Sequence, residues 1–350
     1  MGEVIQPLTI GLIGCGHHGR YHLDNFAAQP ATKLVAVADI NTTRAHSLAE
    51  EFGVAHCYEH YADMLAGHEF DIISLALPPA FNRDLAMAAF EAGAHVMISK
   101  PLALDMAQGR EIIQAARDKD RLLGMMLQGR FSTEVQALRR VIAEGTLGHI
   151  YHSRIWHGHE MHIPASPTLS QRRLAGGGSL FHTTVHLLDA ALWALGNPHP
   201  VRATAANYRK LAKMKRPPVL WEGKVEQCDI EDFNIGLVHF EDGSTMTLES
   251  NWLMHPRTRS AGVEMLGDWG VASLRPLRVE LDEGERVIDA TPELPEHPPN
   301  AYAEVCRDFC QAVRDQALPV VRFDEMLDVQ AIMNALYESA EKGREVEVDL

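Results

Sequence analysis

Cysteine is scarce in this sequence, which has only five among 350 residues: Cys15, Cys57, Cys228, Cys306 and Cys310. The number is odd, and no two of them form a C-x-x-C pair. Small disulfide-stapled domains and zinc ribbons need regularly spaced cysteine pairs, so both classes are excluded. The scarcity is typical of a protein that works in a reducing compartment.

Long apolar runs and an excess of positive charge are also lacking. No run approaches the ~20 apolar residues that a membrane-spanning helix needs. The N-terminus has no basic region followed by a long apolar run, and Gln6 stands where a myristoylation signal needs Ser or Thr. The formal net charge of -15 repels nucleic acid phosphates and anionic lipid surfaces. We therefore expect a cytoplasmic protein that binds neither nucleic acid nor membrane.

The length of 350 residues suggests two domains, because a domain averages about 150 residues. Residues 1–128 alternate short β-branched runs with amphipathic stretches, which predicts a parallel, doubly wound α/β sheet covered on both faces. Gly93 is typical of a residue just past a helix end, and Asp105 of an N-cap. The predicted strands span residues 8–13, 33–38, 71–76, 95–99 and 122–127, and the predicted helices include 82–92 and 107–119.

Residues 129–350 have a different rhythm and predict a second, α+β domain on a large, mainly antiparallel open sheet. Asp242-Gly243 between two alternating runs, 232–240 and 245–252, is a hairpin signal. Residues 289–300 contain four prolines and predict a loop. The other predicted strands are 261–266 and 271–274, and the predicted helices are 179–195, 301–315 and 323–341.

A glycine-rich loop follows the first predicted strand. Gly14, Gly16 and Gly19 form G-x-G-x-x-G between a strand and a helix, the setting in which the motif indicates a dinucleotide pyrophosphate on a helix N-terminus. Asp39, at the end of the second strand, stands where an acid binds the adenosine ribose. This carboxylate repels a 2′-phosphate and favours NAD, while the nearby Arg44 leaves NADP open. His17 and His18 are expected to contribute backbone N–H groups.

Proton-transfer groups occur in two further segments. Lys100, in Ser99-Lys100-Pro101, follows a buried strand at the edge where open α/β sheets bind ligands. Desolvation beside a cationic nicotinamide would depress its pKa and suit it to exchange a proton with a hydroxyl; the alternative is a solvated lysine at a strand end. His182 and His186 are four residues apart, on one face of a predicted helix. Nucleotide, lysine and histidine are thus expected to meet in one cleft.

These motifs resemble the glucose-fructose oxidoreductase, inositol dehydrogenase and rhizopine-catabolism (GFO/IDH/MocA) family over essentially the whole chain. The family's Glu-Lys-Pro appears here as Ser99-Lys100-Pro101, and its Arg-Phe appears as Arg130-Phe131. Residues 175–186 match its Ala-Gly-Gly-Gly block with Asp and His four apart, and residues 340–346 match its closing pattern.

The resemblance implies a Rossmann domain with bound NAD or NADP and a C-terminal domain with a large open sheet. It also implies a sugar, glycoside or cyclitol substrate and a homodimer or homotetramer formed through the sheet face. Lys100 and His186 take the positions of the proton-handling residues, and Gln128 and Pro78 are expected beside the cofactor. The expected reaction moves a hydride between nicotinamide and a hydroxyl-bearing carbon.

Two departures from the family pattern remove negative charge. Ser99 replaces the usual Glu, and His182 stands where many members have a catalytic Asp. Both changes should lower the pKa of Lys100 further. We expect His182 to relay protons or to contact a substrate hydroxyl.

Several other histidine and tryptophan side chains have more than one possible role. His157 and His159, in the run 157–162, are expected on a loop over the substrate, or on a merely solvated loop. Trp156 and Trp252 suit stacking on a sugar ring, although core or interface is favoured for Trp252. The histidines also have spacings that suit a metal, but the chemistry of the fold needs none and we expect none.

Two other functions fit the same residues. An NAD-dependent glycosidase would oxidise, eliminate, add water and reduce, and the extra histidines suit its several proton transfers. A non-catalytic NAD(P) sensor would also keep the fold, although the presence of both Lys100 and His186 argues against it.

Overall fold

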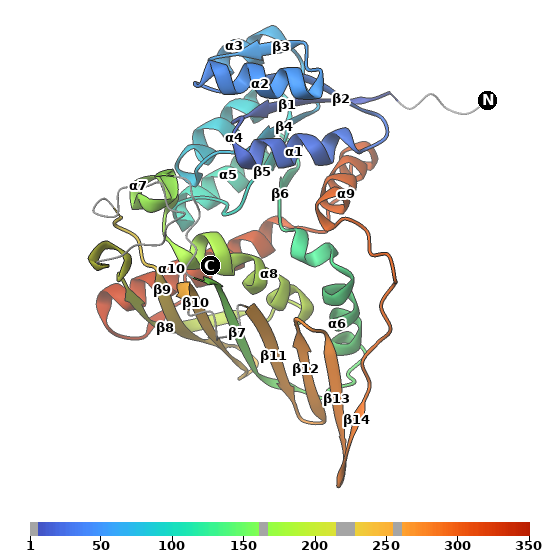
Figure 1. Ribbon diagram of the computed structural model, residues 1–350, viewed down its shortest axis with the longest axis vertical. Helices are drawn as coiled ribbons and strands as arrows, with labels where there is room; N and C mark the ends of the chain where they lie inside the picture. Colours follow the sequence, from blue (N-terminus) through green and yellow to red (C-terminus); the bar gives the residue numbers. More distant parts are fainter. Residues whose placement is uncertain (1–5, 161–166, 215–227, 255–260) are drawn as a thin grey trace, which may run out of the picture. The chain divides into compact units, whose positions relative to one another are not determined.

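The computed structural model describes residues 6–160, 167–214, 228–254 and 261–350 (Figure 1). The chain forms two compact units. Unit 1 comprises Met1–Met126 and Asn300–Met326, and unit 2 comprises Leu127–Pro299 and Leu327–Leu350. In the described segments, no helix is both long and apolar enough to cross a membrane.

Unit 1 contains a six-stranded sheet in the order β3-β2-β1-β4-β5-β6, with every pair parallel. The predicted doubly wound parallel sheet is confirmed. Its strands are β1 (Leu8–Ile13), β2 (Thr32–Ala38), β3 (His56–Tyr58), β4 (Ile72–Leu75), β5 (His95–Ile98) and β6 (Leu123–Met125).

Helices cover both faces of this sheet (Figure 1). They are α1 (His17–Ala27), α2 (Thr42–Phe52), α3 (Tyr61–Gly67), α4 (Asn82–Glu91), α5 (Met106–Asp118) and α9 (Ala301–Asp315). The two predicted helix signals are confirmed, because Gly93 has a φ of 86° and the Asp105 side chain accepts a hydrogen bond from the Gln108 N–H. The burial of β1, β4 and β5 explains their continuous apolar runs.

Unit 2 contains a nine-stranded sheet in the order β14-β13-β12-β11-β7-β10-β9-β8-β15. Only the pair β7–β10 is parallel among the described pairings, so the predicted mainly antiparallel sheet is confirmed. Its strands are β7 (Ile150–Glu160), β8 (Pro200–Tyr208), β9 (Phe233–Phe240), β10 (Thr245–Met254), β11 (Ala261–Gly267), β12 (Gly270–Leu274), β13 (Arg278–Glu283), β14 (Arg286–Asp289) and β15 (Val346–Glu347).

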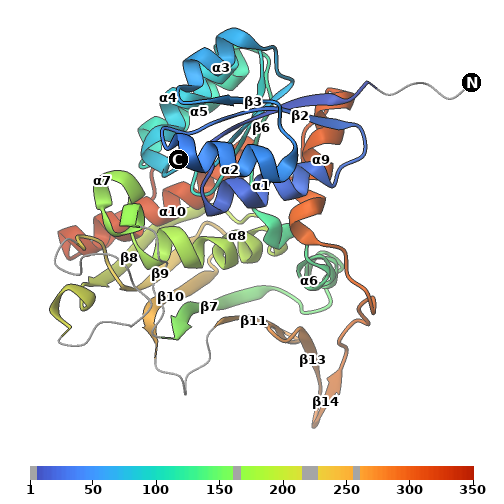
Figure 2. The same ribbon diagram turned by 45° about the horizontal axis from the view of Figure 1, so that its top comes forward.

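Helices lie on one face of the large sheet (Figure 2). They are α6 (Thr133–Ala143), α8 (Val185–Ala194) and most of α10 (Phe323–Lys342), while the short α7 (Arg172–Ala175) precedes the glycine run. Alternate strand residues such as Ile155, Val238 and Leu248 pack against these helices in one core. The predicted hairpin is confirmed, with Gly243 at a φ of 85° between β9 and β10.

One sequence-based expectation for unit 2 was wrong. Residues 157–160 are not a loop, because β7 continues through them. His157 is paired with Ser250 of β10 on one side and with Ala261 of β11 on the other. Strand pairing on both sides satisfies the backbone there, although the sequence is polar. The rest of the predicted loop, residues 161–162, lies outside the described residues.

Candidate active site

The glycine loop joins β1 to α1, and close backbone packing explains its glycines. A Cβ atom on Gly14, whose φ is 96°, would lie 2.5 Å from the Ala76 carbonyl oxygen, and one on Gly19 would lie 2.0 Å from the Gly14 oxygen. The surroundings of Gly16 are open, since its nearest neighbour is an Arg44 nitrogen at 3.7 Å. No side chain caps the N-terminus of α1 at Gly16. The loop therefore presents the first amides of α1 to an anion and fits a dinucleotide pyrophosphate.

Asp39 is held firmly at the end of β2. Its Oδ2 accepts a hydrogen bond of 2.8 Å from the Cys15 N–H, and its Oδ1 accepts one of 2.8 Å from the Asn41 N–H. An Arg44 nitrogen lies 3.7 Å from Oδ2. The carboxylate is thus bonded to Cys15 of the glycine loop itself.

Ile40 is a residue that the sequence analysis missed. It directly follows Asp39 and is 82% exposed. An apolar surface beside the predicted ribose-binding acid suits the face of an adenine ring. The available signal was an apolar residue immediately after the acid at a strand end.

Lys100 lies just past the end of β5, and Pro78 lies past the end of β4. Because these strands are parallel to β1 and β2, both residues lie at the same sheet edge as Gly14 and Asp39. Lys100 is half-buried, and burial lowers its pKa to about 8. A depressed pKa is what the sequence predicted for this lysine.

His18 is nearer to Lys100 than the sequence analysis anticipated. Part of its side chain reaches solvent, yet burial of the remainder, and then the positive charge of Lys100, lower its pKa to about 4. The imidazole is therefore neutral at physiological pH. Its interaction with the charge of Lys100 was not evident from the motif alone.

The histidine helix in unit 2 begins irregularly. The predicted helix of residues 179–195 consists of a π-helical turn, η4 (Leu180–Thr184), followed by α8. His182 lies in the π-helical turn and His186 in α8, so regular α-helical spacing does not relate them. Single π-helical turns occur frequently at functional sites.

His182 is only 9% exposed, and its Nε2 lies 3.2 Å from the Ala175 carbonyl oxygen. Because a carbonyl only accepts, the Nε2 atom carries the hydrogen in this bond. The backbone of Ala175, just before the glycine run, therefore holds the ring of His182. His186 is half-buried one turn further along.

A buried carboxylate anchors the start of this helix. Glu231 accepts hydrogen bonds from the Gly178 N–H at 2.7 Å and from the Leu180 N–H at 3.0 Å, and it also accepts one from the Tyr337 hydroxyl. Burial raises the pKa of Glu231, and these three bonds oppose that shift. The acid accepts from amides at the start of the helix, where the helix itself offers no acceptor.

The same contacts explain the run of glycines. A Cβ atom on Gly177 would lie 2.1 Å from the Tyr337 hydroxyl, and one on Gly178 would lie 1.8 Å from the Glu231 backbone oxygen. Any larger residue would push the histidine helix away from its anchor. Neither Glu231 nor Tyr337 was singled out from the sequence, since nothing local marks a residue that acts on a helix 50 or more positions away.

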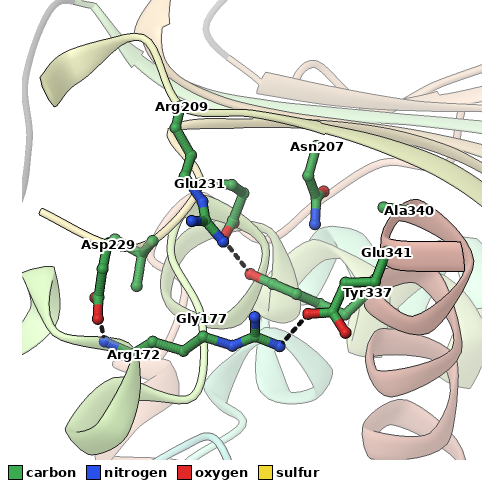
Figure 3. Close-up of a pocket in the computed structure, with 10 residues that line it drawn as sticks. Arg172, Gly177, Asn207, Arg209, Asp229, Glu231, Tyr337, Ala340 and Glu341 are labelled. Carbon is green, nitrogen blue, oxygen red and sulfur yellow. Dashed lines mark hydrogen bonds and ion pairs between the residues drawn. The ribbon is translucent and has the colours of Figure 1, made fainter. Parts of the chain in front are cut away.

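Figure 3 shows Gly177, Glu231 and Tyr337 at the wall of a pocket of about 210 Å³. Arg172 reaches across it to form an ion pair with Glu341. The backbone N–H of Arg172 donates to Asp229 at 2.6 Å. The pocket is lined by Arg172, Gly177, Asn207, Arg209, Asp229, Ile230, Glu231, Tyr337, Ala340 and Glu341.

An ion pair connects the turn that contains Gln128, the residue predicted beside the nicotinamide, to the histidine helix. Gln128 opens a short 3-10 turn, η2 (Gln128–Phe131), and Arg130 of this turn binds Asp189 of α8 with both partners fully buried. A Cβ atom on Gly129 would lie 3.3 Å from the His186 carbonyl oxygen. Unit 2 therefore brings Gln128 and His186 onto adjoining segments.

The strand β7 divides the remaining predicted residues between two faces. The backbone carbonyl of His157 accepts a bond of 3.4 Å from the Thr184 hydroxyl in η4, so His157 lies beside the histidine helix. Trp156 is directed to the other face, where its ring lies over Gly262. This indole is thus separated from the histidine helix by the sheet. The side chain of His159 lies outside the described residues.

Trp252 is confirmed as a core residue. It is 1% exposed, and its Nε1–H donates a hydrogen bond of 2.6 Å to the Thr183 hydroxyl. All five cysteines are free thiols, as expected.

Comparisons with known proteins agree with this geometry. Residues 8–127 match a family model described as an oxidoreductase family with an NAD-binding Rossmann fold, and residues 135–273 match the GFO/IDH/MocA C-terminal domain. D-glucoside 3-dehydrogenase of Escherichia coli K12 is 29% identical over 346 residues, which is 98% of each chain. Levoglucosan dehydrogenase of Pseudarthrobacter phenanthrenivorans is 25% identical over 76% of this chain and 73% of the relative.

A solved structure of a levoglucosan dehydrogenase with NADH and levoglucosan has the same fold. Its TM-score is 0.84 at 24% identity, and the match covers 99% of this chain and 100% of the other. Since the two family models together span most of both units, the chain belongs to the GFO/IDH/MocA family of oxidoreductases.

Proposed function

We propose that this protein is an NAD-dependent dehydrogenase that oxidises a hydroxyl-bearing carbon of a sugar, glycoside or cyclitol. The observation that carries the proposal is the position of Lys100, a lysine of lowered pKa at the same sheet edge as the glycine loop and Asp39. The similarity to D-glucoside 3-dehydrogenase along 98% of the chain supports a glycoside among the substrates.

The residues divide the chemistry as follows. Bound NAD supplies the hydride acceptor. The neutral amine of Lys100 takes the proton of the hydroxyl that is being oxidised, and it returns that proton in the reverse direction. His186 orients the same hydroxyl or takes its proton, and His182 contacts a neighbouring hydroxyl. The proposal brings Lys100 and His186 to one substrate, with His157 and His159 further along it.

In this proposal, the glycine loop and the residues that follow β2, β4 and β5 hold the cofactor. The loop of Gly14, Gly16, His17, His18 and Gly19 would bind the pyrophosphate through its amides, and Asp39 would bind the adenosine ribose. The positive charge of Arg44 lies beside the Asp39 carboxylate and is already paired with it. This pairing leaves the guanidinium less able to bind a 2′-phosphate and favours NAD over NADP. Pro78, Lys100 and Gln128 would lie along the nicotinamide half.

The test is a panel of sugars, methyl glycosides and inositols, measured by NADH absorbance. Lys100→Ala should lower kcat by about 100-fold or more, because proton transfer is lost, and leave the Kd for NAD nearly unchanged. Lys33→Ala, an exposed lysine of the same unit, is the matched control and should keep wild-type kcat. Wild-type turnover in Lys100→Ala, or loss of NAD binding alone, would contradict the role given to this lysine.

We also propose a cytoplasmic homo-oligomer that assembles through the face of the large sheet opposite its helices. The free thiols support a reducing compartment. Ile235 of β9 is 44% exposed, and Leu237, two residues along the same strand, is half-buried; these apolar side chains support a face that a second copy covers. Ile235→Arg should lower the mass measured by light scattering to that of a monomer. An unchanged mass would place the contact elsewhere or leave the protein monomeric.

A further inference from the structure

The backbone on either side of Lys100 is held by buried side chains. On the N-terminal side, the Ser99 hydroxyl lies 2.8 Å from Nε2 of His22, and Nδ1 of the same ring lies 2.6 Å from the Ser74 hydroxyl. His22 is 2% exposed, Ser74 0% and Ser99 7%. One imidazole from α1 therefore joins β4 to the residue that directly precedes the lysine.

The bridge is electrically neutral. Burial, followed by the neighbouring His18, lowers the pKa of His22 to about 3. A neutral imidazole has one N–H donor and one acceptor nitrogen, so one serine hydroxyl donates to the ring and the other accepts from it. Both ring nitrogens are satisfied in a buried position, where a charged partner would be costly.

A second side chain holds the residues that follow Lys100. Asn82, fully buried at the start of α4, donates from Nδ2 to the carbonyl oxygens of Pro101 and Leu102, both at 3.1 Å. The backbone is thus fixed just before and just after Lys100, whose side chain has four rotatable methylene groups. Fixing the Cα position and direction is the part of lysine placement that the protein can control.

We propose that His22 is a positioning residue for Lys100: its Nε2 holds Ser99, and with Asn82 on the other side it fixes the direction in which the lysine leaves the sheet. The inference rests on the proposed function, because it assumes that Lys100 handles the substrate proton. It assigns a role to a histidine that the glycine motif does not include and that is only 2% exposed.

The bridge also explains how the amine stays in its half-buried place without a carboxylate on Ser99. Ser74, His22 and Ser99 add no charge here, and burial lowers the pKa of Lys100. If the backbone at Ser99 were released, the amine would gain access to water and its pKa would rise toward the ordinary value of about 10.4.

Two matched substitutions separate positioning from mere packing. The amide of His22→Gln can replace Nε2 and keep the bond to Ser99, whereas that of His22→Asn can replace Nδ1 and keep only the bond to Ser74. Each variant loses one of the two bonds, so both should lose similar stability. Only His22→Asn should lower kcat, by about 10- to 100-fold, because a displaced catalytic group costs that much.

A second readout needs no substrate. With NAD present, trace acetic anhydride labels neutral amines, and mass spectrometry of the Lys100 peptide from about pH 6 to about pH 11 gives its pKa, with the exposed Lys33 as internal reference. The labelling midpoint should stay near 8 in the wild type and in His22→Gln. It should rise by about one pH unit in His22→Asn.

Milder variants guard against loss of folding. Ser99→Ala should raise the labelling midpoint and lower kcat as His22→Asn does. Ser74→Ala should change both the midpoint and kcat less. Equal kcat values and equal midpoints in His22→Asn and His22→Gln, or in Ser99→Ala and Ser74→Ala, would overturn the inference. Full turnover in Lys100→Ala would contradict the proton-transfer role given to that lysine, whatever the labelling shows. Absence of NADH formation by the wild type on the whole substrate panel would instead overturn the proposed function.

Discussion

Asp39 makes cofactor choice a question of one charge. Its carboxylate accepts the Cys15 and Asn41 amides and lies 3.7 Å from Arg44. Asp39→Asn keeps the size of the side chain, although its NH2 group must face one of these two amides. It removes the repulsion of a 2′-phosphate and releases the arginine. We expect the ratio of Kd for NADP to Kd for NAD to fall by about tenfold or more, about 1.4 kcal/mol, in fluorescence titrations.

A double variant tests the part played by the arginine. In Asp39→Asn combined with Arg44→Ala, the gain for NADP should largely disappear, because no guanidinium remains to meet the phosphate. If Asp39→Asn weakens both cofactors equally, the carboxylate acts mainly as a support for the glycine loop.

At the scale of an element, the histidine helix depends on an acid from outside it. In Glu231→Gln one oxygen becomes an NH2 group, which must face a donor in either orientation, since Gly178, Leu180 and Tyr337 all donate to this carboxylate. We expect the free energy of unfolding to fall by about 1–3 kcal/mol and kcat to fall with it, measured by denaturant unfolding and NADH formation.

Tyr337→Phe is the milder comparison for this anchor. It removes one donor to Glu231 and one acceptor of the Gly178 N–H, while the Gly178 and Leu180 amides keep their bonds to Glu231. Its effect on kcat should therefore be smaller. A Glu231→Gln variant as stable and as active as the wild type would show that the helix start is held by other contacts.

The elements that could be predicted are those whose pattern is local. Residues 8–13 were predicted as a strand and β1 has those bounds, because a buried parallel strand is apolar throughout. The three-residue β3 has no such pattern, and the polar end of β7 owes its conformation to two neighbouring strands. The π-helical turn η4 is likewise set by packing that no spacing in the sequence reveals.

The same distinction applies to the site and to the whole molecule. The glycine motif, Asp39 and Lys100 are recognisable because their roles depend on position next to a strand. Glu231 and His22 act through bonds to residues far along the chain, so no motif contains them. Nor does the sequence reveal that Asn300–Met326 pack with unit 1, where Phe309 lies against Gly124; the boundary between residues 128 and 129 stays a prediction.

For the whole molecule, the buried His22 predicts a loss of stability in mild acid. Its pKa is about 3 in the folded protein but about 6.5 when unfolded, so between these values only the unfolded chain takes up the proton. The contribution is complete above about pH 6.5 and declines as the pH falls toward 3, by up to ~1.4 kcal/mol per pH unit. His22→Gln lacks this titration, whereas carboxylates affect both proteins alike. The stability gap between wild type and variant, measured by urea unfolding, should therefore narrow steadily from about pH 6 to about pH 4, and a constant gap would mean that the ring is already protonated or exposed in the fold.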